Sequence, residues 1–203
     1  ALTLGSVIGT LRTTPRGWVV ALGNAWVEFF RNIPLLVQML LWFFVVPELL
    51  PKDLSMWVKQ DMPAKEFITA SVCLGLFTSA RIAEQVRAGI QSLPRGQLYA
   101  GMAMGFTLPQ TYRYVLLPMA FRIIVPPLTS EFMSVFKNSS VAFAISVLEL
   151  TFQSRQMQED SEQGIETYVA VTILYFVCAF IANRVMGQIE KRTRVPGYVT
   201  GKH

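Results

Sequence analysis

The stretch Tyr99–Gly105 has the sequence Tyr-Ala-Gly-Met-Ala-Met-Gly, is followed at residues 116–118 by Leu-Leu-Pro, and lies between two long apolar segments. A membrane-spanning helix needs about 20 mostly apolar residues. Pro94 and Pro109 leave this stretch too little length for that. We therefore expect a short helix within residues 94–107 that lies outside the membrane. A compact helix between two spans is suited to docking into a groove of another protein.

The composition indicates a polytopic membrane protein. Of the 203 residues, 52% are hydrophobic and only 15% are charged, whereas soluble domains carry about 25% charged residues. The mean hydropathy is +0.41, and the apolar residues come in long blocks. His203 is the only histidine, so neither a histidine-based triad nor the usual metal-ligand spacing is present. Cys73 and Cys178 are expected to be buried, reduced thiols.

The apolar blocks predict a single all-α membrane domain over residues 1–203, with about five transmembrane helices. The first block, residues 1–12, is short, so an N-terminal part of that helix is expected to be missing. The next block, residues 18–46, should be kinked before Pro34, where the ring removes a backbone hydrogen bond. Further helices are expected over 66–92, 110–137, 138–152 and 167–186, the third of them short and suited to a partial crossing. Residues 52–65 and 153–166 are expected to form exposed loops.

Lysine and arginine gather in alternate connections. The turn at residues 12–16, the region 87–113 and the tail 187–203 are strongly basic, whereas 47–66 and 153–166 are mixed or acidic. Cytoplasmic loops carry the excess of Lys and Arg, so the first set should face the cytoplasm. This topology accounts for the net charge of +5. Nucleic-acid binding is not favoured, because no basic stripe interleaved with aromatic residues is present.

The short cytoplasmic helix has a composition typical of protein docking. Ala100, Gly101 and Gly105 are small, so that a partner can approach the backbone closely. Met102 supplies an adaptable apolar contact. An amphipathic helix lying on lipid headgroups is the alternative, but it usually carries Lys and Arg along its polar face. Only Arg95 is available here, so the composition favours protein over lipid.

These residues resemble the Glu-Ala-Ala loop of permease subunits in binding-protein-dependent ABC importers. Residues 28–38, 82–92 and 137–140 resemble the polar amino-acid branch of that family, and Arg81 with residues 92–97 is most similar to its glutamate/aspartate importers. Two departures stand out, since Tyr99 replaces the usual glutamate and Gly101 the second alanine. The resemblance implies a type I importer transmembrane domain whose coupling helix contacts the ATPase through Gln97, Tyr99, Ala100, Gly101, Met102, Gly105 and Pro118.

The resemblance also implies a set of partners in the bacterial inner membrane. These are a cytoplasmic ABC ATPase dimer, a second permease subunit that is either identical or a paralogue, a periplasmic substrate-binding protein over the outer loops, and membrane lipid. The chain contains no Gly-x-x-x-x-Gly-Lys-Ser/Thr loop for binding phosphates. We therefore expect no cofactor and no enzymatic activity in this chain, with ATP bound by the partner subunit.

Candidate substrate-binding residues are the ionisable and polar groups within the spans. Arg81, Glu84 and Arg87 recur at i, i+3 and i+6 and either form a structural ion-pair ladder or leave Arg81 partly free to grip a substrate carboxylate. Asn138 and Ser139 lie beside a broken helix. They either offer hydrogen bonds to a ligand at mid-membrane depth or simply cap the helix.

The sequence thus predicts a permease subunit of an ATP-driven importer of acidic amino acids. Another polar amino acid, such as glutamine, histidine or arginine, is the main alternative substrate. A stand-alone secondary carrier or channel is less favoured, because it predicts inverted repeats and the sequence shows no internal repeat. A membrane subunit that docks a cytoplasmic partner without transport is the remaining alternative.

Overall fold

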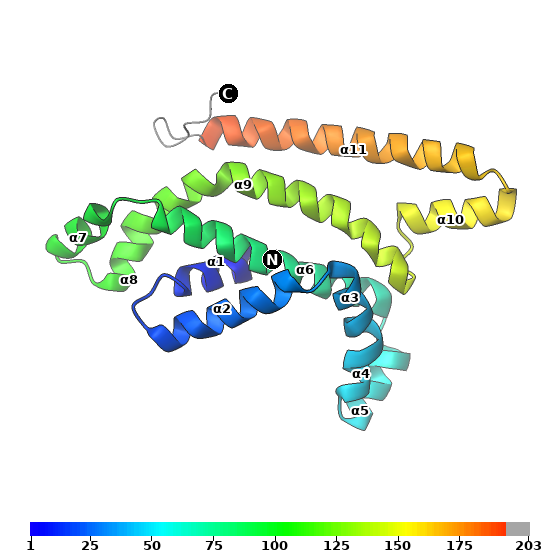
Figure 1. Ribbon diagram of the computed structural model, residues 1–203, viewed down its shortest axis with the longest axis horizontal. Helices are drawn as coiled ribbons and strands as arrows, with labels where there is room; N and C mark the ends of the chain where they lie inside the picture. Colours follow the sequence, from blue (N-terminus) through cyan, green and yellow to red (C-terminus); the bar gives the residue numbers. More distant parts are fainter. Residues whose placement is uncertain (194–203) are drawn as a thin grey trace. The chain divides into compact units, whose positions relative to one another are not determined.

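The computed structural model describes the backbone of residues 1–193 and the side chains of residues 1–192, and every regular element in that range is helical (Figure 1). The α-helices in chain order are α1 (Leu2–Leu11), α2 (Gly17–Asn32), α3 (Leu35–Leu40), α4 (Val46–Leu49), α5 (Lys52–Met56), α6 (Lys65–Gln91), α7 (Arg95–Ala103), α8 (Leu108–Thr111), α9 (Leu117–Asn138), α10 (Leu150–Ser161) and α11 (Gly164–Thr193). Three π segments and one 3-10 helix join them: η1 (Leu41–Val45), η2 (Trp57–Asp61), η3 (Tyr112–Leu116) and η4 (Ser139–Ile145).

Three stretches of the described chain are long and apolar enough to cross a membrane, namely α6, Leu108–Ile145 and α11. The broken pair formed by α2 and Leu35–Leu49 is a fourth candidate, and α1 is a shorter apolar helix. The expected number of about five transmembrane helices, with a short first one, therefore agrees with the structure. The expected break at Pro34 is confirmed, because α2 ends at Asn32 and α3 begins at Leu35.

The chain divides into two compact units, which are described separately. The first unit contains residues 1–30, 78–132 and the segment that begins at Arg184. The second contains residues 31–77 and 133–183.

The core of the first unit lies between α6 and α9, which run alongside each other in Figure 1. Their contact residues recur every four positions, as expected for ridges of one helix that pack into grooves of another. Gly89 of α6 allows a close approach, since a Cβ at this position would lie 2.4 Å from Cγ2 of Ile124. The buried core residues are Ile82, Val86, Ile90, Leu93, Leu116, Ala120 and Ile124.

Two glycines of α1 bring this helix against α6. A Cβ at Gly5 would lie 2.6 Å from the carbonyl oxygen of Ser79, and one at Gly9 would lie 2.6 Å from that of Ala83. Glycines four residues apart lie on one helix face and let two membrane helices pack with their backbones close together. Trp26 of α2 adds a hydrogen bond to Ser79, with 3.3 Å between Nε1 and Oγ. Thus α1 and α2 are both tied to the same part of α6.

Each π segment of the described chain is followed, one residue later, by a proline. The amides that close the wide turns belong to Val46, Met62 and Leu117, and the next residue is a proline in all three cases. A proline ring clashes with the carbonyl four residues earlier and has no amide hydrogen to donate. An i to i+5 turn moves that carbonyl aside. This explains how Pro118 lies within the continuous stretch Leu108–Ile145 without ending it.

The second unit is held together by α3, the first part of α6 and η4. Met39, Cys73 and Ile145 are fully or almost fully buried in its core. Cys73 is therefore buried as expected, but the same prediction for Cys178 is wrong, because Cys178 is exposed on α11. An apolar sequence cannot distinguish a helix face packed within its own chain from one that faces outward.

Several connections differ from the expected loops. Residues 52–65, expected to be a loop, contain α5 and η2, and much of 153–166 is the helix α10. Their polar composition indicates exposure, which is observed for most of these residues, but does not exclude helix. The apolar stretch 138–152 forms η4, which ends at Ser146 in the left-handed region with φ of 64°. Of the expected tail 187–203, the part after Thr193 lies outside the described residues.

Replacing Gly9 with leucine should disrupt the contact between α1 and α6. The new side chain has to displace backbone atoms of α6, and overpacking of this kind typically costs about 1–3 kcal/mol of unfolding free energy. The thermal unfolding midpoint in detergent measures the effect. Gly17→Ala is the matched control, because nothing lies within 4 Å of a Cβ at that position. Equal midpoints for the two variants would contradict the close packing described here.

Candidate functional site

The predicted cytoplasmic helix is present as α7 and has well-defined ends. Pro94 precedes its first residue in an extended conformation. At the other end, the amide of Gly105 donates to the carbonyl of Met102 at 3.0 Å, and that of Phe106 to the carbonyl of Gly101 at 3.2 Å. These two bonds form a Schellman motif, which requires a left-handed residue. Gly105 supplies it with φ of 87°, so its lack of a side chain ends the helix.

The helix α8 follows directly and is fixed by a capping box. The amide of Thr107 donates to Oε1 of Gln110 at 2.8 Å, and the side chain of Thr107 caps the N-terminus of α8 in return. Gly101 of α7 packs against Thr111, since a Cβ on Gly101 would lie 2.6 Å from Cγ2 of Thr111. We refer to residues 94–111 as the elbow. The capping box of Thr107 and Gln110 fixes the start of α8. The backbone of α7 at Gly101 also packs directly against the side chain of Thr111.

The outer face of α7 is apolar and exposed. Tyr99 is 64% exposed, Met102 is 49% exposed and Met104 is 71% exposed. Of the predicted coupling residues, Tyr99, Ala100, Met102, Gly105 and Pro118 are exposed, Gln97 is half-buried and Gly101 is buried. A flexible, exposed methionine and aromatic surface is suited to an apolar partner.

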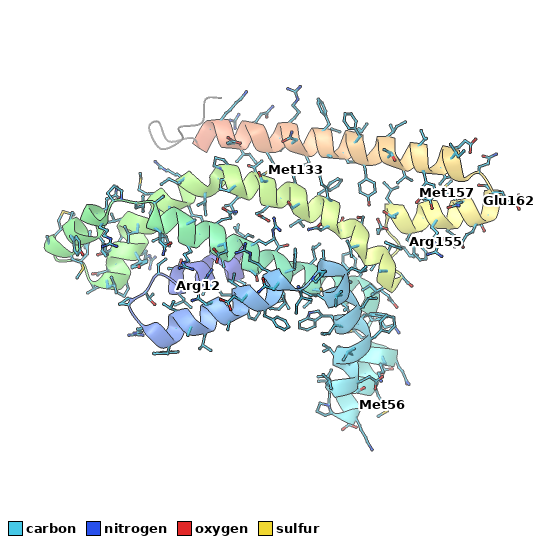
Figure 2. All side chains as sticks on the ribbon, in the orientation of Figure 1. Arg12, Met56, Met133, Arg155, Met157 and Glu162 are labelled. Atoms are coloured by element: carbon cyan, nitrogen blue, oxygen red, sulfur yellow. The ribbon has the colours of Figure 1, made fainter. Side chains whose placement is uncertain are left out.

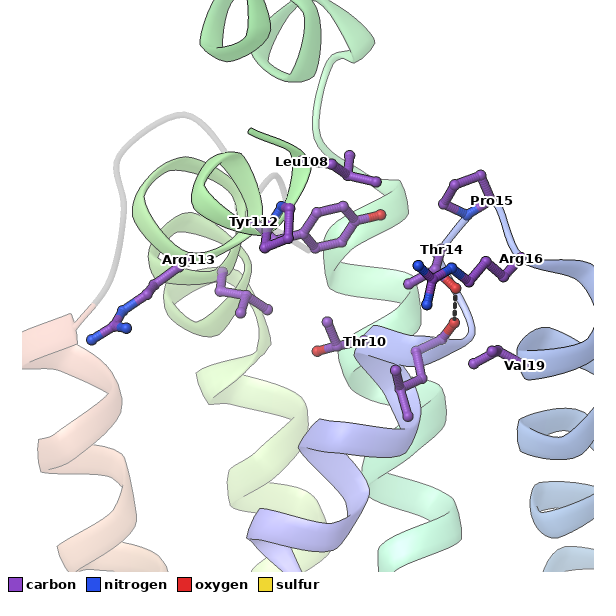
Figure 3. Close-up of a pocket in the computed structure, with 11 residues that line it drawn as sticks. Thr10, Thr14, Pro15, Arg16, Val19, Leu108, Tyr112 and Arg113 are labelled. Atoms are coloured by element: carbon purple, nitrogen blue, oxygen red, sulfur yellow. Dashed lines mark hydrogen bonds between the residues drawn. The ribbon is translucent and has the colours of Figure 1, made fainter. Parts of the chain in front are cut away.

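The segment η3, which directly follows the elbow, is joined to the turn between α1 and α2. The hydroxyl of Tyr112 in η3 donates to the carbonyl of Thr13 at 2.8 Å. Figure 3 shows Tyr112 and Leu108 across from Thr14 of this turn. The turn and the elbow therefore lie at the same end of the first unit, as the distribution of basic residues predicts.

Arg12, labelled in Figure 2, is a buried charge that joins three helices. Its Nη2 lies 2.6 Å from Oε1 of Glu84 in α6, and its Nε donates to Oδ1 of Asn24 in α2 at 2.8 Å. Gly23 makes room for it, because a Cβ there would lie 2.5 Å from Cγ of Arg12. A charge in an apolar bundle must be paired or satisfied by polar groups. This network pairs the charge of Arg12 at the end of α1, while its buried Nη1 has no hydrogen-bond partner among the described residues.

Arg81 forms a side-on ion pair with Glu131 of α9. Its Nε lies 2.6 Å from Oε2, and its Nη2 lies 3.2 Å from Oε1. The side chain of Glu131 is 8% exposed, whereas that of Arg81 is 40% exposed. The Nη1 edge of Arg81 has no hydrogen-bond partner among the described residues. Glu131 thus fixes the plane of the guanidinium and leaves one donor edge open.

Arg81 and Glu84, which the ladder interpretation would place in one row of ion pairs, take different partners. Arg81 pairs with Glu131 of α9, and Glu84 pairs with Arg12 at the end of α1. Residues three positions apart differ by about 60° in direction around a helix, so helices on different sides of α6 supply closer partners. Nε of Arg87 is buried with no hydrogen-bond partner in the described chain. The sequence of α6 alone could not predict these partners, because the opposite charges come from the end of α1 and from α9.

Asn138 and Ser139 lie in the second unit, where α9 changes into η4. The hydroxyl of Ser139 donates to the carbonyl of Phe136 at 2.7 Å, and that of Ser140 to the carbonyl of Lys137 at 2.8 Å. Both hydroxyl protons therefore bond to carbonyls of the preceding helical turn, and the side chain of Asn138 makes no capping hydrogen bond at the start of η4. Their oxygen lone pairs remain able to accept hydrogen bonds.

The second unit also carries a groove of about 440 Å³ beside α10, lined in part by Phe143, Ser146 and Phe152. Arg155 and Glu159 of α10 border it and form an ion pair of 3.1 Å. Figure 2 labels Arg155 on this helix and Glu162 at its end. The helix α10 belongs to a connection that the basic residues place on the outer side.

Two functional features were not found from the sequence. One is Glu131 as the partner of Arg81, although an acidic residue inside a span is itself a signal of a polar site. The other is the network of Arg12 with Glu84 and Asn24, because the sequence shows Arg12 only as part of a basic turn. The spacing Gly5-x-x-x-Gly9 is a known signal for close helix packing in membranes, and it would have placed α1 against another helix.

Comparison with known proteins gives a consistent result. Residues 1–195 match the profile of a family described as the inner membrane component of binding-protein-dependent transport systems. The chain is 47% identical over 204 residues to the glutamate/aspartate import permease protein GltJ of Escherichia coli (strain K12). This alignment covers 100% of this chain and 83% of that relative. It is 33% identical to the probable glutamine ABC transporter permease protein GlnM of Bacillus subtilis (strain 168), over 95% of this chain and 84% of the relative.

Solved structures show the same fold. A crystal structure of an amino acid ABC transporter with histidines matches with a TM-score of 0.77 and 27% identity, over 94% of this chain and 84% of the other. An inward-facing structure of the MetNI methionine ABC transporter matches with a TM-score of 0.74 and 21% identity, over 95% of this chain and 89% of the other. The second similarity is one of fold alone.

Replacing Glu131 with methionine should leave Arg81 without its anion. Breaking a buried ion pair from one side costs about 3–5 kcal/mol, and we expect the lower end because Arg81 is partly exposed. Unfolding in a denaturing detergent measures this loss. The double variant Arg81→Met, Glu131→Met should recover most of it, since replacing both charges by apolar groups is often neutral. A single variant as stable as the unmodified chain would show that the pair does not stabilise the fold.

Proposed function

Because this chain belongs to the family of inner membrane components of binding-protein-dependent transport systems, we propose that it is the permease subunit of an ATP-driven importer of the acidic amino acids glutamate and aspartate. The observation that carries this proposal is its 47% identity, over the whole chain, to a permease named for these substrates. In the bacterial inner membrane the subunit forms part of the translocation path.

Arg81 is the residue that we assign to the substrate. It presents a cationic donor edge from a membrane-crossing helix, and an acidic amino acid carries two carboxylates. Charge-assisted hydrogen bonds from guanidinium to carboxylate are short and strong. Glu131 acts as a positioning residue, because it holds the opposite edge of the same guanidinium. Glu84 neutralises Arg12 and does not contact the substrate. Asn138 and Ser139 supply polar groups for the path.

Glutamine is the second candidate substrate, and one observation favours it. The pair of Arg81 and Glu131 carries no net charge, so it suits a single carboxylate as well as a doubly acidic molecule. A relative named as a probable glutamine permease is 33% identical to this chain. Glutamate has a second carboxylate where glutamine has a neutral amide, so the two proposals differ in whether the protein recognises a second anionic group.

The partners follow from the family. We propose that α7 docks into a groove of a cytoplasmic ABC ATPase dimer, which binds and hydrolyses ATP. A second permease subunit completes the path, since the residues of α11 are exposed along the apolar window in this chain. A periplasmic binding protein delivers the substrate to the outer connections, where α10 and its groove are exposed. ATP-driven closure of the ATPase then changes the exposure of the substrate site.

Uptake into proteoliposomes tests the role of Arg81. Arg81→Gln removes a charge-assisted hydrogen bond, typically worth about 1.5–3 kcal/mol, so kcat/KM for glutamate should fall roughly 10- to 150-fold. Arg81→Lys keeps the charge but not the fork, and should recover part of this loss. The amount of assembled complex serves as the control. Glutamate uptake that is unchanged in Arg81→Gln would contradict the assignment, and uptake of glutamine without glutamate would favour the second candidate.

ATP hydrolysis tests the role of α7. Ala100→Trp adds bulk on the exposed face without altering the packing of Gly101 against Thr111, and should lower substrate-stimulated hydrolysis and uptake by about tenfold or more. Gly105→Trp is expected to abolish uptake too, but it also strains a residue with φ of 87°. Lys52→Trp places the same bulk on an exposed residue of the opposite connection. Equal substrate-stimulated ATP hydrolysis and equal uptake in Ala100→Trp and Lys52→Trp would rule out docking through this face.

A further inference from the structure

Two apolar grooves of the first unit share one wall. The first, of about 470 Å³, lies between the end of α1, the turn at residues 13–16, the start of α2 and the segment from α8 through η3 (Figure 3). The second, of about 400 Å³, lies between α1 and α2. Leu11, Arg16 and Val19 line both. The shared wall therefore combines two apolar side chains with one cation.

Arg16 is exposed and makes no ion pair among the described residues. In Figure 3 its guanidinium reaches from the turn toward the side on which Tyr112 lies. Arg113 also lines the first groove, although its guanidinium points away from the turn in the same view. Trp18, which is 68% exposed, lines the second groove. An exposed tryptophan beside arginine is typical of the membrane–water interface.

We propose that these grooves hold the two acyl chains of one anionic phospholipid, with its phosphate at Arg16. The turn belongs to the basic, cytoplasmic set of connections, so the grooves open at the depth of the inner leaflet's headgroups. Basic pockets between membrane helices on this side bind anionic headgroups. Two apolar grooves that meet at a cation match the two chains and the single phosphate of such a lipid. A zwitterionic lipid fits the grooves equally well but gains less from Arg16.

The proposed lipid site is connected to the elbow through Tyr112 and Thr111. Tyr112 lines the first groove and also donates its hydroxyl proton to the carbonyl of Thr13. The next residue toward α7 is Thr111, against which Gly101 packs. A lipid in these grooves fills the space between the turn and the base of the elbow, and so limits their relative movement. We therefore expect anionic lipid to strengthen the coupling between ATP hydrolysis and transport.

Lipid retention measured by native mass spectrometry tests the site directly. The purified complex is equilibrated with phosphatidylglycerol or phosphatidylcholine of the same chain length, and we expect preferential retention of phosphatidylglycerol. One basic residue near an anionic surface accounts for about a fivefold change in binding, so Arg16→Gln should reduce that preference about fivefold. Arg192→Gln is the matched control. It removes an exposed arginine from the end of α11 that lines neither groove.

Val19→Trp separates groove occupancy from charge. Because Val19 lines both grooves, the larger side chain should reduce the retention of both lipids, whereas Arg16→Gln should affect phosphatidylglycerol alone. Equal retention of the two lipids by the unmodified complex would overturn the proposal. So would an equal loss of preference in Arg16→Gln and Arg192→Gln, which indicates diffuse surface charge. A disulfide formed between Val19→Cys and the second permease would show instead that a subunit fills the grooves.

Transport assays separate this proposal from the assigned substrate. Uptake and ATP hydrolysis are measured in nanodiscs or vesicles with and without phosphatidylglycerol, for whichever amino acid the complex transports. Moles of substrate moved per ATP should rise about twofold or more with phosphatidylglycerol in the unmodified complex, and should stay low in Arg16→Gln. A ratio that is independent of the lipid would overturn the regulatory role, even if glutamate uptake itself is confirmed.

Discussion

Charges placed on membrane helices must be neutralised within the bundle, and this constraint organises the first unit. Arg12 pairs with Glu84, and Arg81 pairs with Glu131. Each pair joins two different helices, so that α1, α6 and α9 are connected by electrostatics as well as by apolar contacts. Gly23 of α2 leaves room for the side chain of Arg12, because a Cβ there would lie 2.5 Å from its Cγ. Pairing removes the cost of an isolated charge in an apolar medium, and the Nη1 edge of Arg81 keeps no hydrogen-bond partner among the described residues.

The same unit carries the elbow, which is stiff within itself and linked to the bundle. The Schellman motif at Gly105 and the capping box of Thr107 with Gln110 satisfy the backbone at the junction of α7 and α8. The exposed side of α7 is apolar, whereas the inner side lacks side-chain bulk at Gly101. One face of α7 is thus used for packing within the chain, and the other face stays exposed.

Local signals explain most of what the sequence predicted. Hydropathy located the spans, and the basic residues placed the turn at 12–16 and the elbow at one end, as the bond from Tyr112 to Thr13 confirms. The short helix expected within residues 94–107 is present as α7. The partner of Arg81 could not be predicted, because the choice between Glu84 and Glu131 depends on which helix lies opposite. The same limit applies to Cys178, since an apolar residue carries no record of whether it faces its own chain or the surroundings.

The wide turn at η3 has a mechanical consequence. Pro118 contributes no amide hydrogen, so one backbone bond is missing at the point where the elbow continues into α9. Helices bend most easily where this ladder is interrupted. Torque applied to α7 by a motor protein would therefore be released first as a change in tilt at this turn, and the buried contacts of Leu116 and Ala120 would act as the fulcrum. The helix would pivot there, while its membrane portion keeps its register against α6.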